Sequence, residues 1–221
     1  MKSPRRDGRE RREALLDAAL RCFSERGVLG TGIEEIRKEA GASPSSVYHL
    51  FDGLPGLTLA LLARTFDRLA GHLASRVVPA KSAEEAVTAL VDAHIEWVLT
   101  HRDEARFMYQ AFALEFTPEP TLELQAQKAQ SLAPITTAVG RFIAEGALPA
   151  WSPLLFDVVL LGPSHEACRR WLAGAELDPT FMRATFPKLA WQSVSHLGGA
   201  AKAKTSRTKT TSKKTASKRR G

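Results

Sequence analysis

Stretches with apolar residues at helical spacing alternate along the chain with short polar breaks. In residues 9–26, for example, Leu16, Leu20 and Phe23 form one apolar stripe on an otherwise polar segment. No segment alternates between apolar and polar residues in the manner of a strand bounded by turn pairs. The pattern therefore predicts an all-α fold with about nine helices.

Residues 31–51 predict two short helices joined by a tight turn. Thr31 stands just before apolar residues at helical spacing, so we expect it to be the N-cap of the first helix. Gly41 can end that helix in the left-handed conformation. Ser43 then offers a second N-cap, and Pro44 follows at the first helical position. This order predicts a helix-turn-helix.

The second of these helices is short, polar on its outer side and nearly uncharged. Val47 and Phe51 lie four residues apart and are expected to face inward. The outward positions are then Ser45, Ser46, Tyr48 and His49. Such a face suits contact with a polar surface.

The motifs LLDAALRCFSERG, Thr-x-Ile-x-x-Ile, Ala-Gly-Ala-Ser and Val-Tyr-His-x-Phe follow one another in an order that resembles the DNA-binding domain of the tetracycline-repressor (TetR) family. The resemblance covers about residues 10–62 and implies a three-helix DNA-binding domain. Two positions depart from the family pattern. Arg37 stands where members carry a small residue, so it is expected to point to solvent. Leu54 stands where members carry a lysine that contacts a phosphate, so that contact is lost or made elsewhere.

Helices are expected in the rest of the chain over 57–78, 83–99, 103–116 and 121–145, then from Ser152 to Gly174 with an interruption at Gly162 and Pro163, and over 178–197. Pro134 and Pro187 are expected to bend two of them. We therefore predict four parts: a basic N-terminal arm over 1–9, a helix-turn-helix domain over 10–56, a helical ligand-binding and dimerisation domain over 57–198, and a disordered basic tail over 199–221.

The net charge of +7 is unevenly distributed. Residues 1–12 carry +4 and residues 202–221 carry nine basic and no acidic residues, which leaves −6 for the remainder. The tail resembles the lysine-rich tails of some bacterial histone-like proteins. A phosphate-binding role for the two basic segments and a merely solvated charge run are both open.

The chain holds no obvious catalytic, cofactor or metal site. Asp92, His94 and Glu96 are spaced two apart and do not face one another on a helix, and His94 and His101 share a face without a third ligand. Phosphate and dinucleotide loops are lacking. His165 and Cys168 are close enough to touch, but packing is favoured over nucleophilic chemistry. A disulfide between Cys22 and Cys168 is not excluded, although a reduced cytosolic setting is the default.

Aromatic, Met and His residues in the central helices predict either ordinary core or an apolar effector cavity. The residues chosen for such a cavity are His94, Trp97, Met108, Tyr109 and Phe112. The segment from Gly162 to Gly174 resembles the penultimate helix of TetR-family regulators, which pairs with the last helix in a dimer. The apolar candidates for that interface are Leu161, Trp171, Leu172, Leu189 and Val194.

Together these features predict a cytoplasmic, nucleoid-associated bacterial regulator rather than an enzyme. It would be a ligand-responsive repressor that binds a palindromic operator on double-stranded DNA as a homodimer, with a small apolar effector and no membrane partner. The expected DNA-contacting residues are Thr31, Ser43, Pro44, Ser45, Ser46, Tyr48 and His49. The alternative is an architectural DNA-binding protein whose basic tail dominates and whose site preference is weak.

Overall fold

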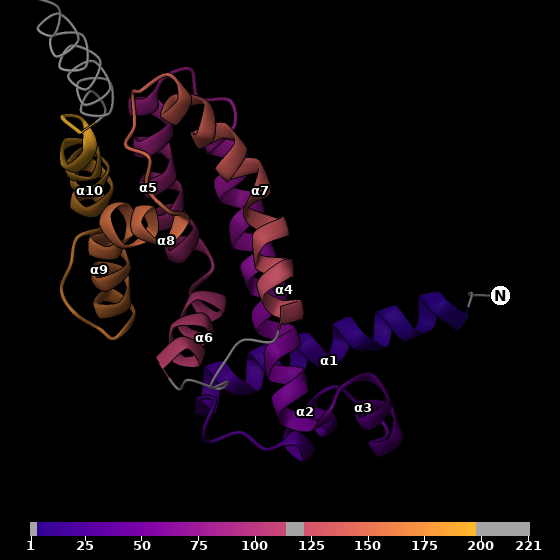
Figure 1. The fold of residues 1–221 in the computed structure, drawn as a ribbon. Helices are drawn as coiled ribbons and strands as arrows, with labels where there is room; N and C mark the ends of the chain where they lie inside the picture. The colour runs from indigo at the N-terminus through magenta and orange to yellow at the C-terminus, as the bar shows by residue number, and fades with distance from the viewer. Residues whose placement is uncertain (1–3, 114–121, 198–221) are drawn as a thin grey trace, which may run out of the picture. The chain divides into compact units, whose positions relative to one another are not determined.

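A computed structural model describes residues 4–113 and 122–197 of the chain, and every regular element in this part is helical (Figure 1). The elements are α1 (Pro4–Arg26), α2 (Ile33–Glu39), α3 (Pro44–Leu50), α4 (Gly53–Val77), α5 (Ala83–Thr100), α6 (Arg102–Ala113), α7 (Leu122–Ala144), α8 (Pro153–Phe156), η1 (Asp157–Leu161), α9 (Gly162–Leu172) and α10 (Pro179–Val194). α8, η1 and α9 form one uninterrupted run. Counted in this way, the described residues hold nine helices, which confirms the predicted all-α fold.

Most helix ends follow the capping residues seen in the sequence. The Ser82 hydroxyl accepts a hydrogen bond from the backbone N–H of Glu85, and Asp178 caps α10 by accepting one from Thr180. α4 starts at Gly53, four residues before the expected start at Leu57. α1 starts at Pro4, so residues 4–9 of the predicted arm are helical. The basic tail lies outside the described residues.

The expected interruption at Gly162 and Pro163 is wrong. The helix continues through this point because its preceding turn, η1, widens to π geometry, in which the Gly162 N–H donates to the carbonyl of Asp157. In a regular α-helix Pro163 would lack its donor and its ring would collide with the carbonyl of Val159. The widened turn accommodates the proline without breaking the run.

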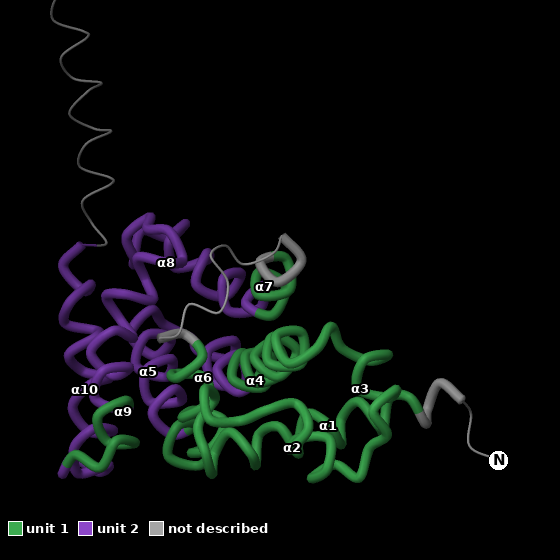
Figure 2. Tube along the Cα trace, turned by 90° about the horizontal axis from the view of Figure 1, so that it is seen from below, with its two compact units in different colours: residues 1–71, 97–131, 169–175 green, residues 72–96, 132–168, 176–221 purple. Residues whose placement is uncertain are grey.

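The chain divides into two compact units (Figure 2). Unit 1 comprises residues 1–71, 97–131 and 169–175. In its core Phe23 of α1 stacks on Phe107 of α6, with ring centroids 5.4 Å apart. Other buried apolar side chains of this unit include Leu15, Leu16, Ile36, Val47, Leu57 and Leu61. The helix-turn-helix is therefore anchored in a packed core of its own unit.

Unit 2 comprises residues 72–96, 132–168 and 176–221. Its buried apolar side chains include Val91, Ile95, Leu160, Met182 and Val194. An exposed bidentate ion pair joins α10 to α5, with Arg183 Nε and Nη2 each 2.7 Å from a carboxylate oxygen of Asp92. Cys168 of this unit and Cys22 of unit 1 are both buried free thiols, so the disulfide left open above is not formed.

Candidate nucleic-acid interface and effector cavity

The start of α3 is shaped by a cluster of serines. The Ser43 hydroxyl accepts a hydrogen bond from the backbone N–H of Ser46 at 3.3 Å, and Pro44 occupies the first helical position, as expected. Ser43 Oγ also lies 3.1 Å from Ser45 Oγ and 2.7 Å from Ser46 Oγ. In the preceding turn Gly41 has φ +61°, the left-handed conformation that a side chain would disfavour. The cap, the proline and the glycine together set the direction of α3.

The two sides of α3 differ sharply in exposure. Val47 and Phe51 are buried and hold the helix against the unit 1 core, as expected. Tyr48 is 64% exposed, and Pro44, Ser45 and His49 are exposed as well. Ser46 is half-buried. The polar side of α3 is therefore open to a partner.

Thr31 is not the N-cap of α2, contrary to our expectation. The N-cap is Gly32, whose N–H donates to the Glu35 carboxylate at 2.8 Å. Thr31 is only 4% exposed, and its hydroxyl points inward, donating to the carbonyls of Gly27 at 2.8 Å and Cys22 at 3.3 Å. The hydroxyl is used to close the end of α1, so only the backbone of Thr31 is left for a DNA contact.

Arg37 was expected to point to solvent, but its side chain is partly buried. Its side chain is 22% exposed, with Nε 2.8 Å from Glu34 and Nη1 donating to the carbonyl of Ala42 at 3.0 Å. The guanidinium has several donors in one plane, so it can bond to both groups at once. Arg37 thereby ties α2 to the turn before α3, a role that a small residue cannot perform.

Unit 1 also holds α1 and α4 against each other with a partly buried ion cluster. Arg64 of α4 is 11% exposed, and its Nη1 lies 3.0 Å from Glu13 and 2.8 Å from Asp17 of α1. The Arg12 guanidinium lies over the Phe51 ring, 5.4 Å from its centroid. These contacts fix α1, the end of α3 and α4 within one unit.

A hollow of about 290 Å³ lies between α1 and the helix-turn-helix turn. It is lined by Arg11, Ala14, Leu15, Ala40, Gly41, Ala42, Ser43 and Ser46. Arg11 is exposed and is the basic residue in this lining. It stands beside the serines of α3, whereas Leu54, at the position of the family lysine, has no charge. The sequence showed the cluster of N-terminal arginines but not which of them lies beside α3.

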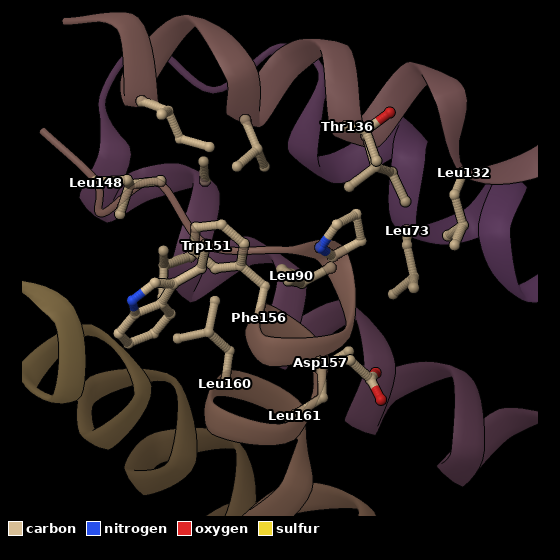
Figure 3. Close-up of a pocket in the computed structure, with 16 residues that line it drawn as sticks. Leu73, Leu90, Leu132, Thr136, Leu148, Trp151, Phe156, Asp157, Leu160 and Leu161 are labelled. Carbon is tan, nitrogen blue, oxygen red and sulfur yellow. The ribbon is translucent and has the colours of Figure 1, made fainter. Parts of the chain in front are cut away.

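Unit 2 contains a cavity of about 200 Å³ (Figure 3). Most of its wall is apolar, from Leu73 of α4 through α5 and α7 to the loop before α8. The remaining wall comes from α8 and η1 and includes the only lining carboxylate among the described residues, Asp157. The full lining is Leu73, Ala86, Val87, Leu90, Leu132, Ile135, Thr136, Val139, Ile143, Leu148, Trp151, Pro153, Phe156, Asp157, Leu160 and Leu161.

The residues predicted from sequence to bind an effector are spread over both units. Trp97 and Met108 are buried in unit 1, and Tyr109 there is half-buried. Phe112 lies in α6, but its side chain is outside the described set. None of the four described side chains lines the cavity of unit 2. Leucine, valine and isoleucine make most of its wall, and in a sequence these look like any other core.

His94, the fifth of these residues, is fully buried in a stack with His165 of α9. The ring centroids are 4.3 Å apart, and His94 Nδ1 lies 3.3 Å from the hydroxyl of Ser164. Burial, and then the neighbouring His165, lower the pKa of His94 well below its ordinary value. Burial also lowers the pKa of His165, while the charge of Asp157 acts in the opposite direction. His94 is thus a neutral core histidine at neutral pH.

The described residues contain neither a cluster of metal ligands nor a membrane-spanning helix. Among residues 4–113 and 122–197, no three His, Cys, Asp or Glu side chains are grouped so that they could hold a metal ion. Within the same ranges no helix is both long enough and apolar enough to cross a membrane.

Comparison with known proteins agrees with the geometry of the helix-turn-helix. The family described as "Bacterial regulatory proteins, tetR family" matches residues 15–61. The regulator BetI of Brucella canis is 33% identical over 81 residues, which are 37% of this chain and 41% of BetI, so this match spans less than half of that relative. The transcriptional activator FasR of Mycolicibacterium smegmatis is 26% identical over 190 residues, covering 85% of this chain and 84% of FasR.

Solved structures share the fold over most of the chain. A TetR-family regulator from Marinobacter aquaeolei has a TM-score of 0.71 at 21% identity, covering 86% of this chain and 98% of that one. FadR of Bacillus subtilis, solved in complex with stearoyl-CoA, has a TM-score of 0.61 at 15% identity, covering 80% and 96%. The exposed recognition face on a helix-turn-helix that matches this family identifies a DNA-binding domain in unit 1. Residues 15–61 thus form a TetR-family DNA-binding domain, and the chain as a whole has the fold of TetR-family regulators.

Proposed function

We propose that this regulator is a ligand-responsive repressor that acts in the bacterial cytoplasm as a homodimer on a palindromic operator. The observation that carries the proposal is the apolar cavity of unit 2 in a chain whose unit 1 holds an exposed recognition helix. A DNA-binding protein with a purely architectural role has no need of such a cavity. The division into a DNA-binding domain over 10–56 and an effector and dimerisation domain over 57–198 belongs to the same proposal.

On the operator, α3 enters the major groove with its N-terminus toward the bases. Pro44, Ser45 and Ser46 lie nearest the base edges, while Tyr48 and His49 hydrogen-bond to phosphates. Ser43 orients this group by capping the helix, and Thr31 contributes only a backbone N–H. α3 contains no Arg or Asn for bidentate contacts to bases, so specificity depends on apolar contacts, water and DNA shape.

The proposed dimer uses the exposed apolar residues of unit 2. Those that lie on α8, η1 and α10 are Leu154, Leu155, Val158, Phe181 and Leu189. Of the interface candidates chosen from sequence, Leu189 is exposed, Trp171 and Leu172 are half-buried, and Leu161 and Val194 are buried within their own chain. A second copy of the chain can therefore contact Leu189 but not Val194. Two-fold pairing of this face places two copies of α3 on two half-sites.

The proposed effector is a small, largely apolar molecule held in the unit 2 cavity. The stearoyl-CoA bound to the FadR structure supports an effector with an apolar chain. The sign of regulation is a separate question, because FasR is named an activator. A repressor is the simpler proposal, since blocking a promoter requires only DNA binding.

Genome-wide mapping of bound sites, followed by DNA binding in vitro, tests this function. The expected result is one short palindrome bound far more tightly than scrambled DNA at equal salt, and raised transcription of the adjacent gene when the regulator is deleted. Equal affinity for the palindrome and scrambled DNA would contradict the proposal and favour the architectural alternative. Lowered transcription after deletion would show an activator.

A further inference from the structure

We infer that the unit 2 cavity selects a small apolar molecule with a cationic or hydrogen-bond-donating end, and that Asp157 is the residue that makes this selection. The inference rests on the proposed function only in taking the cavity as an effector site. It adds the chemical class of the effector, which a hydrophobic wall alone does not define.

The apolar part of the cavity accounts for the body of such a ligand. Trp151 and Phe156 lie together in the lining, with ring centroids 5.5 Å apart and ring planes tilted by 53° (Figure 3). Leu73, Leu132 and Leu160 continue the wall. Sites for small molecules combine a wall of this kind with a few placed polar groups that fix the orientation. The chemistry of those groups therefore decides which ligand end is accepted.

Only two side chains with oxygen atoms are present in the described lining, Thr136 and Asp157. The Thr136 hydroxyl donates to the carbonyl of Ala133 at 3.1 Å, so it is left mainly as an acceptor. A carboxylate accepts hydrogen bonds and attracts a cation. Both groups thus favour a ligand end that donates, and neither favours a carboxylate or phosphate.

The charge of Asp157 is not cancelled by a basic residue in this lining, because the described lining contains no Lys, Arg or His. Burial lowers the pKa of the His165 imidazole, and the nearby carboxylate of Asp157 raises that pKa by a smaller amount. The imidazole is therefore neutral near pH 7 and does not neutralise Asp157. Asp157 is itself exposed, so it marks the mouth of the cavity. Figure 3 shows it at the opposite side of the lining from Leu148 and Trp151. A bound molecule places its apolar end toward Trp151 and its polar end at Asp157.

The size of the cavity also argues for a small ligand. Its volume of about 200 Å³ lies below the roughly 300–1,000 Å³ of pockets for drug-sized molecules. A long acyl chain with a polyanionic head, as in the stearoyl-CoA bound to FadR, is therefore a poor match in both length and charge.

Isothermal titration of the full-length protein with octylamine, octanol and octanoate, each below its micelle concentration, tests the inference. The three probes share a chain and differ only at the polar end. We expect octylamine to bind roughly threefold to tenfold more tightly than octanoate, because the partly exposed charge of Asp157 attracts the amine and repels the carboxylate and the two modest effects add. Octanol should bind with an affinity between the two. Asp157→Asn, which keeps the side-chain shape, should reduce the difference between amine and carboxylate to less than about twofold.

Two further variants locate the binding. Val139→Trp, at a half-buried lining position, should fill the cavity and abolish binding of all three probes, whereas Glu84→Gln, at an exposed position of α5 outside the lining, should leave all three affinities unchanged. Octanoate binding as tightly as octylamine, or a preference for amine that survives in Asp157→Asn, overturns the inference. Failure of all three probes to bind overturns it as well. None of these results changes the operator test of the proposed function.

Discussion

At the scale of single residues, the inward hydroxyl of Thr31 predicts a stability effect that is separate from DNA binding. Thr31→Val keeps the shape but leaves the Gly27 carbonyl without its donor, so unfolding should become easier by about 1–3 kcal/mol. Thr31→Ser retains the hydroxyl and is the matched control. Urea denaturation of both variants measures the difference, and equal stability of Thr31→Val and the parent would contradict the assigned hydrogen bonds.

Tyr48 offers the opposite case, a residue expected to affect binding without affecting stability. Because its side chain is 64% exposed, Tyr48→Phe should leave the melting temperature unchanged. Loss of the hydroxyl should weaken operator binding by about 0.5–1.5 kcal/mol, the usual value of one hydrogen bond. Fluorescence anisotropy on labelled operator at fixed salt is the measurement. Unaltered affinity would show that the Tyr48 hydroxyl does not hydrogen-bond to a phosphate.

At the scale of elements, the stacked histidines of α5 and α9 predict a loss of stability in acid. The folded pKa of His94 is lowered, so below its unfolded value of about 6.5 the unfolded chain binds a proton that the folded chain does not. The stabilisation is complete above about pH 6.5 and declines as the pH falls toward the folded pKa, by up to about 1.4 kcal/mol per pH unit for each such histidine.

Unfolding free energies measured between pH 7.5 and 5 should show this slope, and His94→Gln should reduce it. His196→Gln, at an exposed position, serves as the control and should leave the slope as it is. A slope that His94→Gln does not change would assign the acid sensitivity to other groups.

Local sequence signals predicted most elements because the deciding interactions lie within a few residues. Ser43, Ser82 and Asp178 each cap a helix from the position where the sequence places them. Thr31 and Pro163 were misjudged because a wider context decides there. The Thr31 hydroxyl reaches back to α1 rather than forward to α2, and a π turn upstream of Pro163 preserves the helix.

The recognition face could be predicted from local sequence, whereas the cavity could not. Exposure of Tyr48 and His49 follows from the position of Val47 in a single short helix, so sequence periodicity was sufficient. The cavity is formed by residues from α4 to η1, which are about 90 positions apart in the sequence. The aliphatic side chains of its wall are the same residue types as those of a filled core, so the sequence does not distinguish the two.

At the scale of the whole molecule, the proposed dimer can be tested with two aliphatic residues on α10 that differ sharply in exposure. Leu189 is 50% exposed and Val194 is fully buried. Leu189→Glu should give a monomer with unchanged helicity at micromolar concentration. Val194→Glu should instead unfold the chain, because it buries a charge without a partner. Light scattering with circular dichroism distinguishes the two, and a dimeric Leu189→Glu would exclude α10 from the interface.

The basic tail, residues 202–221, lies outside the described residues, and its role remains a sequence prediction. Its nine cations release counterions on binding phosphates, and log K falls by about 0.9 against log salt for each contact. If half of them engage, deletion of the tail should reduce the salt slope by roughly 4 per chain and leave the preference for operator over scrambled DNA intact. A salt titration of the full-length protein and the 1–201 truncation measures this, and identical slopes would show a merely solvated tail.

The π turn at η1 has a consequence for how this chain tolerates length changes. One α-helical residue corresponds to a rotation of about 100° around the helix axis. Because a π turn takes up one residue more than an α turn, deleting one residue from Asp157–Leu161 would restore a regular helix and keep the register of α9. Regular α geometry over the same residues with none removed would instead rotate everything after them by about that angle relative to α8. His165 and Cys168 would then leave the core positions they now occupy, while Leu154 and Leu155 would stay where they are. The register between the exposed apolar face of α8 and the buried face of α9 is thus encoded by a single residue.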